Sequence, residues 1–337
     1  MNILKEKLII VGAGLSGLYL ATLLEEKFDV TIIEARDRIG GRIFSIEGHD
    51  LGPSWIWSHH TAILELLSSM DIEIFPQYTK GYAIFDTLGK IEHFIPQESI
   101  PSFRVDKTLS LLINKLHKKL KYTKILLNEN VLSVLEKDEF IEISTDKNTF
   151  NAHKIIFAIP PRFCANLNFT PKLDSQILNK LSKTQTWMGN SSKCVIEFDT
   201  AFWKDQNLSG FVFSNQGPMA EIHDACTEEK AALFGFVSAM VNEEKLKEDI
   251  KKQLQRIFKI EESKIGNIYL VDWRKEKFTA TIEDAKPLRE HPLYGIDISL
   301  AKEKILFSST EFSNKEGGYL EGAVLRAQEI ANKLLIY

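Results

Sequence analysis

The sequence has little cysteine and no metal-binding pattern. Of its 337 residues only Cys164, Cys194 and Cys226 are cysteines, and they form no C-x-x-C pair. This argues against a disulfide framework and a zinc site, and it favours a reducing, cytoplasmic setting. The eight histidines have no metal-ligand spacing, and the side chains of the adjacent His59 and His60 are expected to point apart. No metal site is therefore predicted.

Long apolar runs and an excess of basic charge are also missing. A membrane-spanning helix needs about 20 consecutive apolar residues, whereas glycines and charges interrupt the one candidate, residues 8–26, which also lacks a signal-peptide cleavage site. No membrane anchor is expected. The formal charge of −4 argues against nucleic acid as a partner. With 44% hydrophobic and 26% charged residues, the chain has the composition of a soluble globular protein, long enough for two domains.

Residues 8–26 instead show the pattern of a strand, a glycine turn and a helix. The first four are a short apolar run, typical of a buried parallel strand. Gly12, Gly14 and Gly17 then complete a G-x-G-x-x-G motif at the start of the apolar helix. In such a motif one glycine makes the turn, one admits a pyrophosphate, and one lets helix and strand pack closely. The helix N-terminus attracts the phosphate charge, so a dinucleotide site is predicted.

A second glycine turn follows the next strand. Residues 30–33 predict that strand, and Glu34 at its end would accept hydrogen bonds from ribose hydroxyls. The sequence ARDRIGGR comes next, where Gly41 and Arg42 would meet the same pyrophosphate, the arginine as a bidentate donor. NAD sites do not need this second turn, so FAD is favoured. The predicted FAD contacts in this region are Gly12, Ala13, Gly14, Gly17, Glu34, Ala35, Arg36, Gly41 and Arg42.

The order of strands and helices predicts a discontinuous two-domain plan. The C-terminal tail returns to nucleotide-domain character, with a strand at residues 305–308 and a long helix after it, so the middle of the chain would be inserted. The expected fold class is α/β, an FAD-binding Rossmann-type (GG-doublet) domain with a smaller inserted α+β substrate domain. The FAD-binding domain would comprise residues 1–75, 121–165 and 291–337, and the substrate domain residues 76–120 and 166–290.

Four stretches give the chain a resemblance to a known family. They are the glycine motif through EARDRIGGR, DLGPSWIW at residues 50–57, SSKCVIEFDTAFW at 191–203 and TEFSNKEGGYLEGAV at 310–324. Together they resemble the flavin-containing amine oxidases, which include monoamine and polyamine oxidases and flavin-dependent histone demethylases. The resemblance runs nearly end to end. The chain is nevertheless much shorter than usual for that family, and we expect the missing length to come largely from the substrate domain.

The resemblance implies which residues meet the flavin ring. Gly52 and Trp55 would lie near the ring, with Pro53 and Ser54 between them. Lys193 matches the lysine that binds a water near flavin N5, although a lysine on a strand is usually exposed. If it is desolvated there, its pKa should be depressed.

The resemblance also assigns three further cofactor contacts. Val131 matches the position whose backbone meets the adenine. Glu311 matches a carboxylate that hydrogen-bonds the ribityl-phosphate portion of FAD. Leu320 matches the residue whose backbone amide meets flavin O2.

The amine would be aligned by an aromatic cage. Tyr319 matches one wall of the family's cage; the alternative is a tyrosine packed in the core at the start of a helix. The second aromatic is expected within residues 278–283, where Phe278 is the only aromatic side chain. No cysteine lies in that segment or beside Tyr319, so FAD is expected to be bound non-covalently.

The reaction implied by the resemblance is oxidation of an amine C–N bond. A hydride would pass to flavin N5, the imine would hydrolyse, and O2 or another electron acceptor would reoxidise the flavin, O2 giving H2O2. Lys193, Tyr319 and Trp55 are the predicted catalytic residues. Two alternatives stay open. One is an FAD oxidoreductase acting on an amino acid, a C–C bond or a dihydronicotinamide, with Arg104 or Arg162 anchoring a carboxylate. The other is a flavin-binding protein without turnover.

Overall fold

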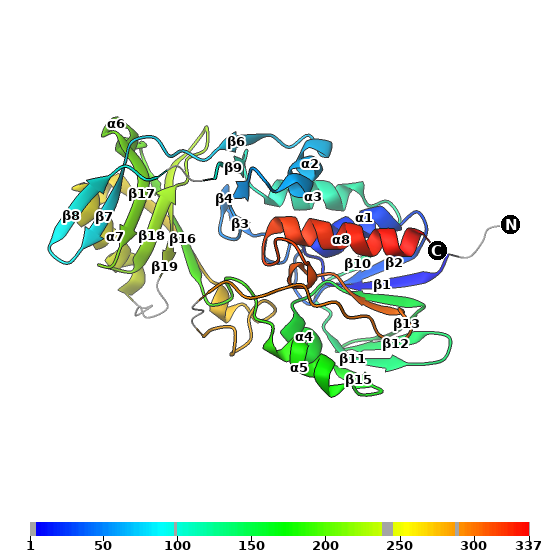
Figure 1. The fold of residues 1–337 in the computed structure, drawn as a ribbon. Helices are drawn as coiled ribbons and strands as arrows, with labels where there is room; N and C mark the ends of the chain where they lie inside the picture. The colour runs from blue at the N-terminus through cyan, green and yellow to red at the C-terminus, as the bar shows by residue number, and fades with distance from the viewer. Residues whose placement is uncertain (1–4, 98–99, 238–244, 287–289, 337) are drawn as a thin grey trace.

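The structure is a computed structural model that describes residues 5–97, 100–237, 245–286 and 290–336 (Figure 1). At its centre is a five-stranded parallel sheet with the strand order β10-β2-β1-β14-β21. The strands are β1 (Lys7–Val11), β2 (Asp29–Ile33), β10 (Lys124–Leu126), β14 (Lys154–Phe157) and β21 (Ile305–Phe307). The strands predicted at residues 8–11, 30–33 and 305–308 are confirmed, the last ending one residue earlier than expected.

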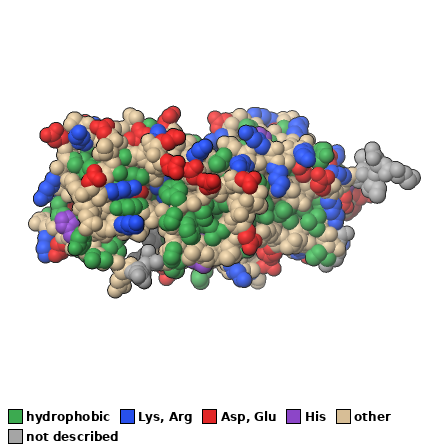
Figure 2. Space-filling view, turned by 90° about the horizontal axis from the view of Figure 1, so that it is seen from above, with side chains coloured by type: hydrophobic (Ala, Val, Ile, Leu, Met, Phe, Trp, Pro, Cys, Tyr) green, Lys and Arg blue, Asp and Glu red, His purple; other side chains and the backbone are tan. Residues whose placement is uncertain are grey.

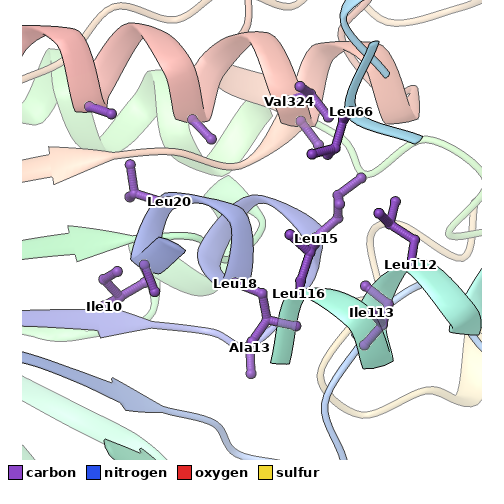
Figure 3. Close-up of a cluster of buried hydrophobic side chains, with 14 of the residues drawn as sticks. Ile10, Ala13, Leu15, Leu18, Leu20, Leu66, Leu112, Ile113, Leu116 and Val324 are labelled. Atoms are coloured by element: carbon purple, nitrogen blue, oxygen red, sulfur yellow. The ribbon is translucent and has the colours of Figure 1, made fainter. Parts of the chain in front are cut away.

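Both faces of this sheet are covered. Along β1, Leu8 and Ile10 pack into a cluster with the helices α1 (Leu15–Leu24), α2 (Thr61–Ser69), α3 (Ser110–Lys119) and α8 (Leu320–Leu335). Figure 3 shows where the apolar side chains of these helices meet, above Ile10 and Ala13. Ile9 and Val11 point to the opposite face, against a second apolar cluster. This two-sided burial explains why residues 8–11 are uninterrupted apolar residues rather than an alternating pattern.

The opposite face is covered by a four-stranded sheet and two short helices. The strands are β11 (Val131–Glu136), β12 (Ile141–Thr145), β13 (Thr149–Ala152) and β15 (Asn168–Thr170), in the order β13-β12-β11-β15. The helices are α4 (Pro161–Ala165) and α5 (Ser175–Lys183). The fold class predicted from the sequence, an α/β protein with a Rossmann-type nucleotide-binding half, is confirmed.

A separate seven-stranded sheet forms the second half of the molecule, on the left of Figure 1. Its order is β20-β16-β19-β18-β17-β7-β8, and helix α7 (Leu246–Phe258) packs on one face. The strands are β7 (Tyr82–Thr87), β8 (Lys90–Phe94), β16 (Ser192–Phe198), β17 (Leu208–Ser214), β18 (Met219–Asp224), β19 (Ala231–Val237) and β20 (Ile265–Asp272). On β16, Cys194 and Ile196 join the cluster under α7, which leaves Lys193 and Val195 on the other face. Lys193 therefore faces the nucleotide-binding half.

The remaining elements of the described residues are short. They are β3 (Ser45–Ile46), β4 (His49–Asp50), β5 (Ile56–Trp57), β6 (Ile74–Pro76), β9 (Ser102–Val105), α6 (Phe202–Asp205), η2 (Glu262–Lys264), η3 (Trp273–Lys275) and η4 (Thr310–Phe312). Helix α3, expected in the substrate domain, packs instead in the same apolar cluster as α1. The domain boundaries themselves stay a prediction.

No helix within the described residues is long and apolar enough to cross a membrane. On the face seen in Figure 2, acidic and basic side chains are interspersed rather than gathered by sign. This agrees with the small net charge of −4.

A buried carboxylate on α8 fixes the start of α2. The oxygens of Glu321 accept hydrogen bonds from the backbone amides of Ala62 (3.0 Å) and Ile63 (2.8 Å), and Glu321 is 3% exposed. The first amides of a helix have no partner within the helix, and a negative charge there is favourable. Glu321 therefore ties the segment before α2 to the N-terminal turn of α8.

The replacement Glu321→Gln should destabilise the protein. One buried amide of α2 would lose its acceptor and the charge at the helix N-terminus would be removed, which together should cost about 1–3 kcal/mol of unfolding free energy. Chemical denaturation measures this, with Glu65→Gln, an exposed carboxylate on α2, as the matched control. Equal stabilities of the two variants would contradict the capping role.

Candidate active site

One long cavity is lined by residues of both halves of the molecule. Its volume is about 940 Å³, near the upper end of the roughly 300–1,000 Å³ range of ligand and cofactor sites. The predicted site residues on its wall are Gly12, Gly14, Glu34, Ala35, Arg36, Gly41, Arg42, Gly52, Pro53, Ser54, Trp55, Val131, Lys193, Tyr319 and Leu320. The structure thus brings together residues from four distant parts of the sequence, 12–55, 131, 193 and 319–320.

The three glycines of the first turn have different surroundings. Gly12 has φ +104°, and a Cβ there would lie 2.8 Å from the carbonyl oxygen of Ala158. A Cβ at Gly17 would lie 2.0 Å from the carbonyl oxygen of Gly12, so this glycine allows helix and turn to pack closely. Gly14, the N-cap of α1, has no atom within 4 Å of its Cβ position, which faces the cavity. Only Gly14 therefore leaves room for a ligand.

Glu34 lies at the cavity wall with its carboxylate fixed. Its oxygens accept hydrogen bonds from the backbone amides of Ala13 (2.8 Å) and Arg36 (2.9 Å), and it is 4% exposed. Ala13 itself is not on the wall; its amide orients the carboxylate. Each carboxylate oxygen can accept more than one hydrogen bond, so Glu34 can still accept from a ligand hydroxyl.

Arg42 has a protein partner that the sequence did not indicate. Its guanidinium donates to both oxygens of Glu311, at 2.6 and 3.2 Å, and Glu311 is fully buried away from the cavity wall. Burial alone would lower the pKa of Arg42, but the adjacent Glu311 charge outweighs it and raises that pKa. Because Glu311 is fully buried and is not on the cavity wall, it is not placed to contact a ligand in the cavity directly. Glu311 instead fixes the guanidinium at the cavity.

Lys193 is buried, 3% exposed, at the wall of the cavity. Its ammonium donates to the carbonyl oxygen of Gly52 (2.8 Å) and to Ser54 Oγ, and it lies 4.4 Å from the centre of the Phe234 ring. Burial lowers the pKa of Lys193 to about 7, although the charge of Asp50 opposes the shift. The expectation of a desolvated lysine with a depressed pKa is met.

Aromatic rings surround the same end of the cavity. Trp55 donates to Gln77 Oε1 (2.9 Å), and its ring centre lies 5.1 Å from that of Phe234. Tyr319, the N-cap of α8, meets Trp57 edge-on with ring centres 5.3 Å apart. Trp55, Trp57, Phe234 and Tyr319 all line the cavity.

The predicted second cage residue is elsewhere. Phe278 lies beside Arg36, with its ring centre 5.7 Å from the guanidinium carbon, because Arg36 holds this segment through a hydrogen bond to Thr279 Oγ1 (2.6 Å). The ring stacked on Tyr319 is His291, with centres 5.3 Å apart and planes 9° apart. Phe278 thus lines the cavity beside Arg36 rather than beside Tyr319.

Two arginines considered as carboxylate anchors are occupied by other groups. Arg104 donates to the carbonyl oxygens of Cys226 (2.9 Å) and Ala225 (3.2 Å). Arg162 forms an ion pair with the buried Asp284 (2.6 Å). Neither arginine is on the cavity wall, so neither anchors a substrate carboxylate there.

The cysteines and the histidine pair are the remaining groups for which predictions were made from the sequence. All three cysteines are free and buried, and burial raises the pKa of Cys194 to about 12, so it is a neutral thiol as expected. The side chains of His59 and His60 do not point apart as predicted. Their ring centres are 4.6 Å apart and both meet the carboxylate of Glu316.

Several residues of the cavity wall belong to no motif that could be recognised in the sequence. Phe234 and Phe236 alternate along β19, so they share the cavity-facing side of the second sheet. Glu221 on β18 adds a carboxylate to that wall. The alternation was visible in the sequence, but which face would meet the cavity depends on the position of α7.

The comparisons with known proteins agree with this geometry. A family model described as flavin containing amine oxidoreductase matches residues 94–335, and one described as an NAD(P)-binding Rossmann-like domain matches residues 10–69. The chain belongs to the flavin-containing amine oxidoreductase family. Members of this family are FAD-dependent oxidoreductases that act on amines, so the protein is an FAD-dependent oxidoreductase of the amine oxidase type.

The relatives are distant but span nearly the whole chain. Flavin-containing amine oxidase A of Sus scrofa is 23% identical over 449 residues, covering 97% of this chain and 84% of the relative. The L-amino acid dehydrogenase of Synechocystis sp. is 21% identical over 446 residues, covering 97% of this chain and 94% of the relative. Both alignments are longer than the 337 residues of this amine oxidase, so the relatives contain segments without a counterpart here.

Solved structures share the fold. Putrescine oxidase bound to putrescine has a TM-score of 0.84 at 19% identity, covering 99% of this chain and 100% of that chain. Cyclohexylamine oxidase from Brevibacterium oxydans has a TM-score of 0.81 at 17% identity, covering 98% and 100%. This chain therefore shares the overall fold of these structures.

The residues present fit FAD. Gly14 leaves open space at the N-terminus of α1, where a Cβ would project into the cavity. Ser309 lines the cavity, and its hydroxyl is buried without a hydrogen-bond partner among the described residues. A bound ligand would supply that partner. Glu34, Arg42 and Val131 all line the same cavity.

Filling the space at Gly14 should remove FAD without unfolding the protein. In Gly14→Asn the new side chain is a good N-cap for α1, but it occupies the space predicted for the pyrophosphate. We expect the dissociation constant of FAD to rise at least about tenfold, which is the effect of losing roughly 1.4 kcal/mol of binding, so that less FAD co-purifies with the protein. The thermal midpoint of the flavin-free protein should stay unchanged. Absorbance at the flavin band measures the content.

The control for this prediction is Gly48→Asn. Gly48 also has no neighbour within 4 Å of its Cβ position and lies away from the cavity wall. Asparagine tolerates its positive φ of +82°. A full FAD content in Gly14→Asn would place the cofactor elsewhere.

The pKa of Lys193 predicts a pH-dependent stability. The folded protein releases the proton near pH 7, whereas the unfolded chain keeps it up to about 10.5. Between these values the unfolded state binds more protons, so the unfolding free energy rises with pH, by at most about 1.4 kcal/mol per pH unit for one group. Denaturation of the flavin-free protein between pH 7 and 9 should show a steeper rise in the wild type than in Lys193→Met. Parallel curves would contradict the depressed pKa.

Proposed function

We propose that this protein binds FAD non-covalently and oxidises the C–N bond of a small amine. The observation that carries the proposal is the buried Lys193, which faces the cavity wall from the second sheet while Tyr319 and the N-terminus of α8 face it from the nucleotide-binding half. The proposed non-covalent attachment rests on the position of the three cysteines, which are buried away from the cavity wall.

The nucleotide-binding half would hold the cofactor. Gly14 and the first amides of α1 receive the pyrophosphate, Glu34 accepts from a ribose, and Arg42, fixed by Glu311, supplies positive charge. Val131 would meet the adenine through its backbone. When bound, FAD supplies the hydride acceptor of the reaction and, through O2 or another acceptor, the route for the electrons.

Lys193 would hold a water molecule at the reacting end. An ammonium has three N–H donors, and those of Lys193 meet the carbonyl oxygen of Gly52 and Ser54 Oγ. The third donor is left for a water in the cavity. Because its pKa is about 7, Lys193 can also exchange a proton with that water at neutral pH.

Helix α8 would stabilise negative charge at the same end. Its first residue, Leu320, lines the cavity, and the amides of its first turn form the positive end of the helix dipole. Preorganised donors of this kind favour the acceptance of a hydride by lowering the energy of the charge that develops.

The amine would lie among aromatic side chains. Tyr319, Trp57 and Trp55 exclude water and orient an apolar substituent, and ring faces attract a cationic amine before it loses its proton. Glu221, a carboxylate on the same wall, adds attraction for the ammonium form. An amino-acid substrate is less well supported, because Arg104 and Arg162 are both bound to other groups.

An anaerobic titration tests the proposal. The purified yellow protein is mixed with amines, amino acids and NADH, and the flavin absorbance is followed. We expect bleaching by an amine and, in Lys193→Met, reduction slower by about 10²-fold, the usual scale for loss of a preorganised polar group. Lys247→Met, an exposed lysine on α7, is the matched control and should reduce at the wild-type rate.

Two other outcomes would each favour an alternative function. Bleaching only by an amino acid or NADH would favour the alternative oxidoreductase. Reduction by dithionite but by no biological donor would favour a flavin-binding protein without turnover.

A further inference from the structure

Two histidines and a glutamate converge just outside the aromatic end of the cavity. His60 Nε2 lies 3.2 Å from one carboxylate oxygen of Glu316, and His59 Nε2 lies 3.6 Å from the other. The three candidate ligand atoms all lie within 4.8 Å of one another. Around a tetrahedral zinc ion with bonds of roughly 2.0–2.1 Å, neighbouring ligand atoms are about 3.3 Å apart. The distances from the two imidazole nitrogens to the Glu316 oxygens are therefore close to those between neighbouring ligand atoms of a zinc ion.

We propose that His59, His60 and Glu316 bind a divalent cation of the zinc type, with water completing its coordination. Two imidazole nitrogens and one carboxylate are the ligand set of open, three-ligand zinc sites. Imidazole also suits copper and nickel, so the site selects a chemical class rather than one element. The site is separate from the FAD contacts and does not depend on the proposed amine oxidation.

The backbone holds the ligands in position before any ion binds. The His60 amide donates to the carbonyl oxygen of Trp57 (2.9 Å), and the Glu316 carbonyl accepts from the amide of Tyr319 (3.2 Å). The carboxylate of Glu321 joins these two segments by accepting from the first amides of α2. A site held this way loses little conformational freedom when the ion binds.

A single polar contact within the described part of the chain orients the buried His60 ring. His60 is 1% exposed, and its Nδ1 has no hydrogen-bond partner among the described residues. The polar contact that orients this ring is therefore the one made by Nε2, toward Glu316. The side chains of His59 and Glu316 are 45% and 36% exposed, so a hydrated ion can reach the cluster from solvent.

An ion bound at this site would restrain the aromatic wall of the cavity. The His60 ring centre lies 5.3 Å from that of Trp57 and 5.8 Å from that of Tyr319, and both of these rings line the cavity. Coordination would fix the His60 ring and join the segment that carries Trp57 to the segment that carries Tyr319. The inferred role is to make this wall rigid.

Calorimetric titration of the FAD-loaded, full-length protein with Zn²⁺ tests the site. We expect saturable binding of one ion per chain and a rise in the thermal midpoint with Zn²⁺. His59→Gln and Glu316→Gln should each weaken the affinity by more than about 100-fold, since even loss of a group behind a ligand costs roughly 10–100-fold. His60 is left unchanged because replacing this buried ring would disturb packing.

The matched control is His117→Gln, an exposed histidine on α3, which should bind Zn²⁺ as tightly as the wild type. Unchanged circular dichroism of the His59 and Glu316 variants shows that they are folded. Absence of saturable binding, or equal affinity in the wild type and in His59→Gln, would overturn the proposal.

Discussion

The ion pair between Arg42 and Glu311 is the constraint on which the cofactor end of the cavity depends. It joins the second glycine turn to the η4 segment, 269 positions later in the chain. Glu311 is fully buried, and removing one partner of a buried pair leaves an uncompensated charge that costs about 3–5 kcal/mol. The η4 segment leads into α8, which covers α1 and, through Glu321, fixes the start of α2. The first and last parts of the chain must therefore fold together.

Residues 49–52 make one set of the contacts between the second sheet and this frame. Lys193 donates to Gly52, the indole of Trp273 donates to the carbonyl oxygen of Leu51 (2.9 Å), and His49 meets Glu197 (2.9 Å). Lys193 is buried where the two halves meet, and this burial lowers its pKa. The desolvation that gives this lysine a neutral-range pKa is thus a direct result of how the two halves pack. The shorter chain keeps the contacts that create the site.

Sequence reasoning succeeded where local pattern decides the structure. The glycine spacing at residues 12–17, the apolar run of β1 and the alternation along β16 each specify a local shape, and the structure has all three. It failed where a contact with a residue far away in the chain determines the position of a side chain. The partner of Arg42, the position of Phe278 beside Arg36 and the convergence of His59 and His60 on Glu316 depend on contacts between residues more than 200 positions apart. Residue type and spacing along the chain carry no information about such pairs.

The central claim is that the flavin ring lies between Lys193 and the N-terminus of α8. A crystal structure of the FAD-loaded protein tests it most directly. We expect the ring at the cavity end lined by Lys193, Trp55 and Leu320, with flavin N5 linked to the Lys193 ammonium through one water. A flavin ring at the other end of the cavity, beside Glu34 and Phe278, would contradict it, as would a ring with no water between N5 and Lys193.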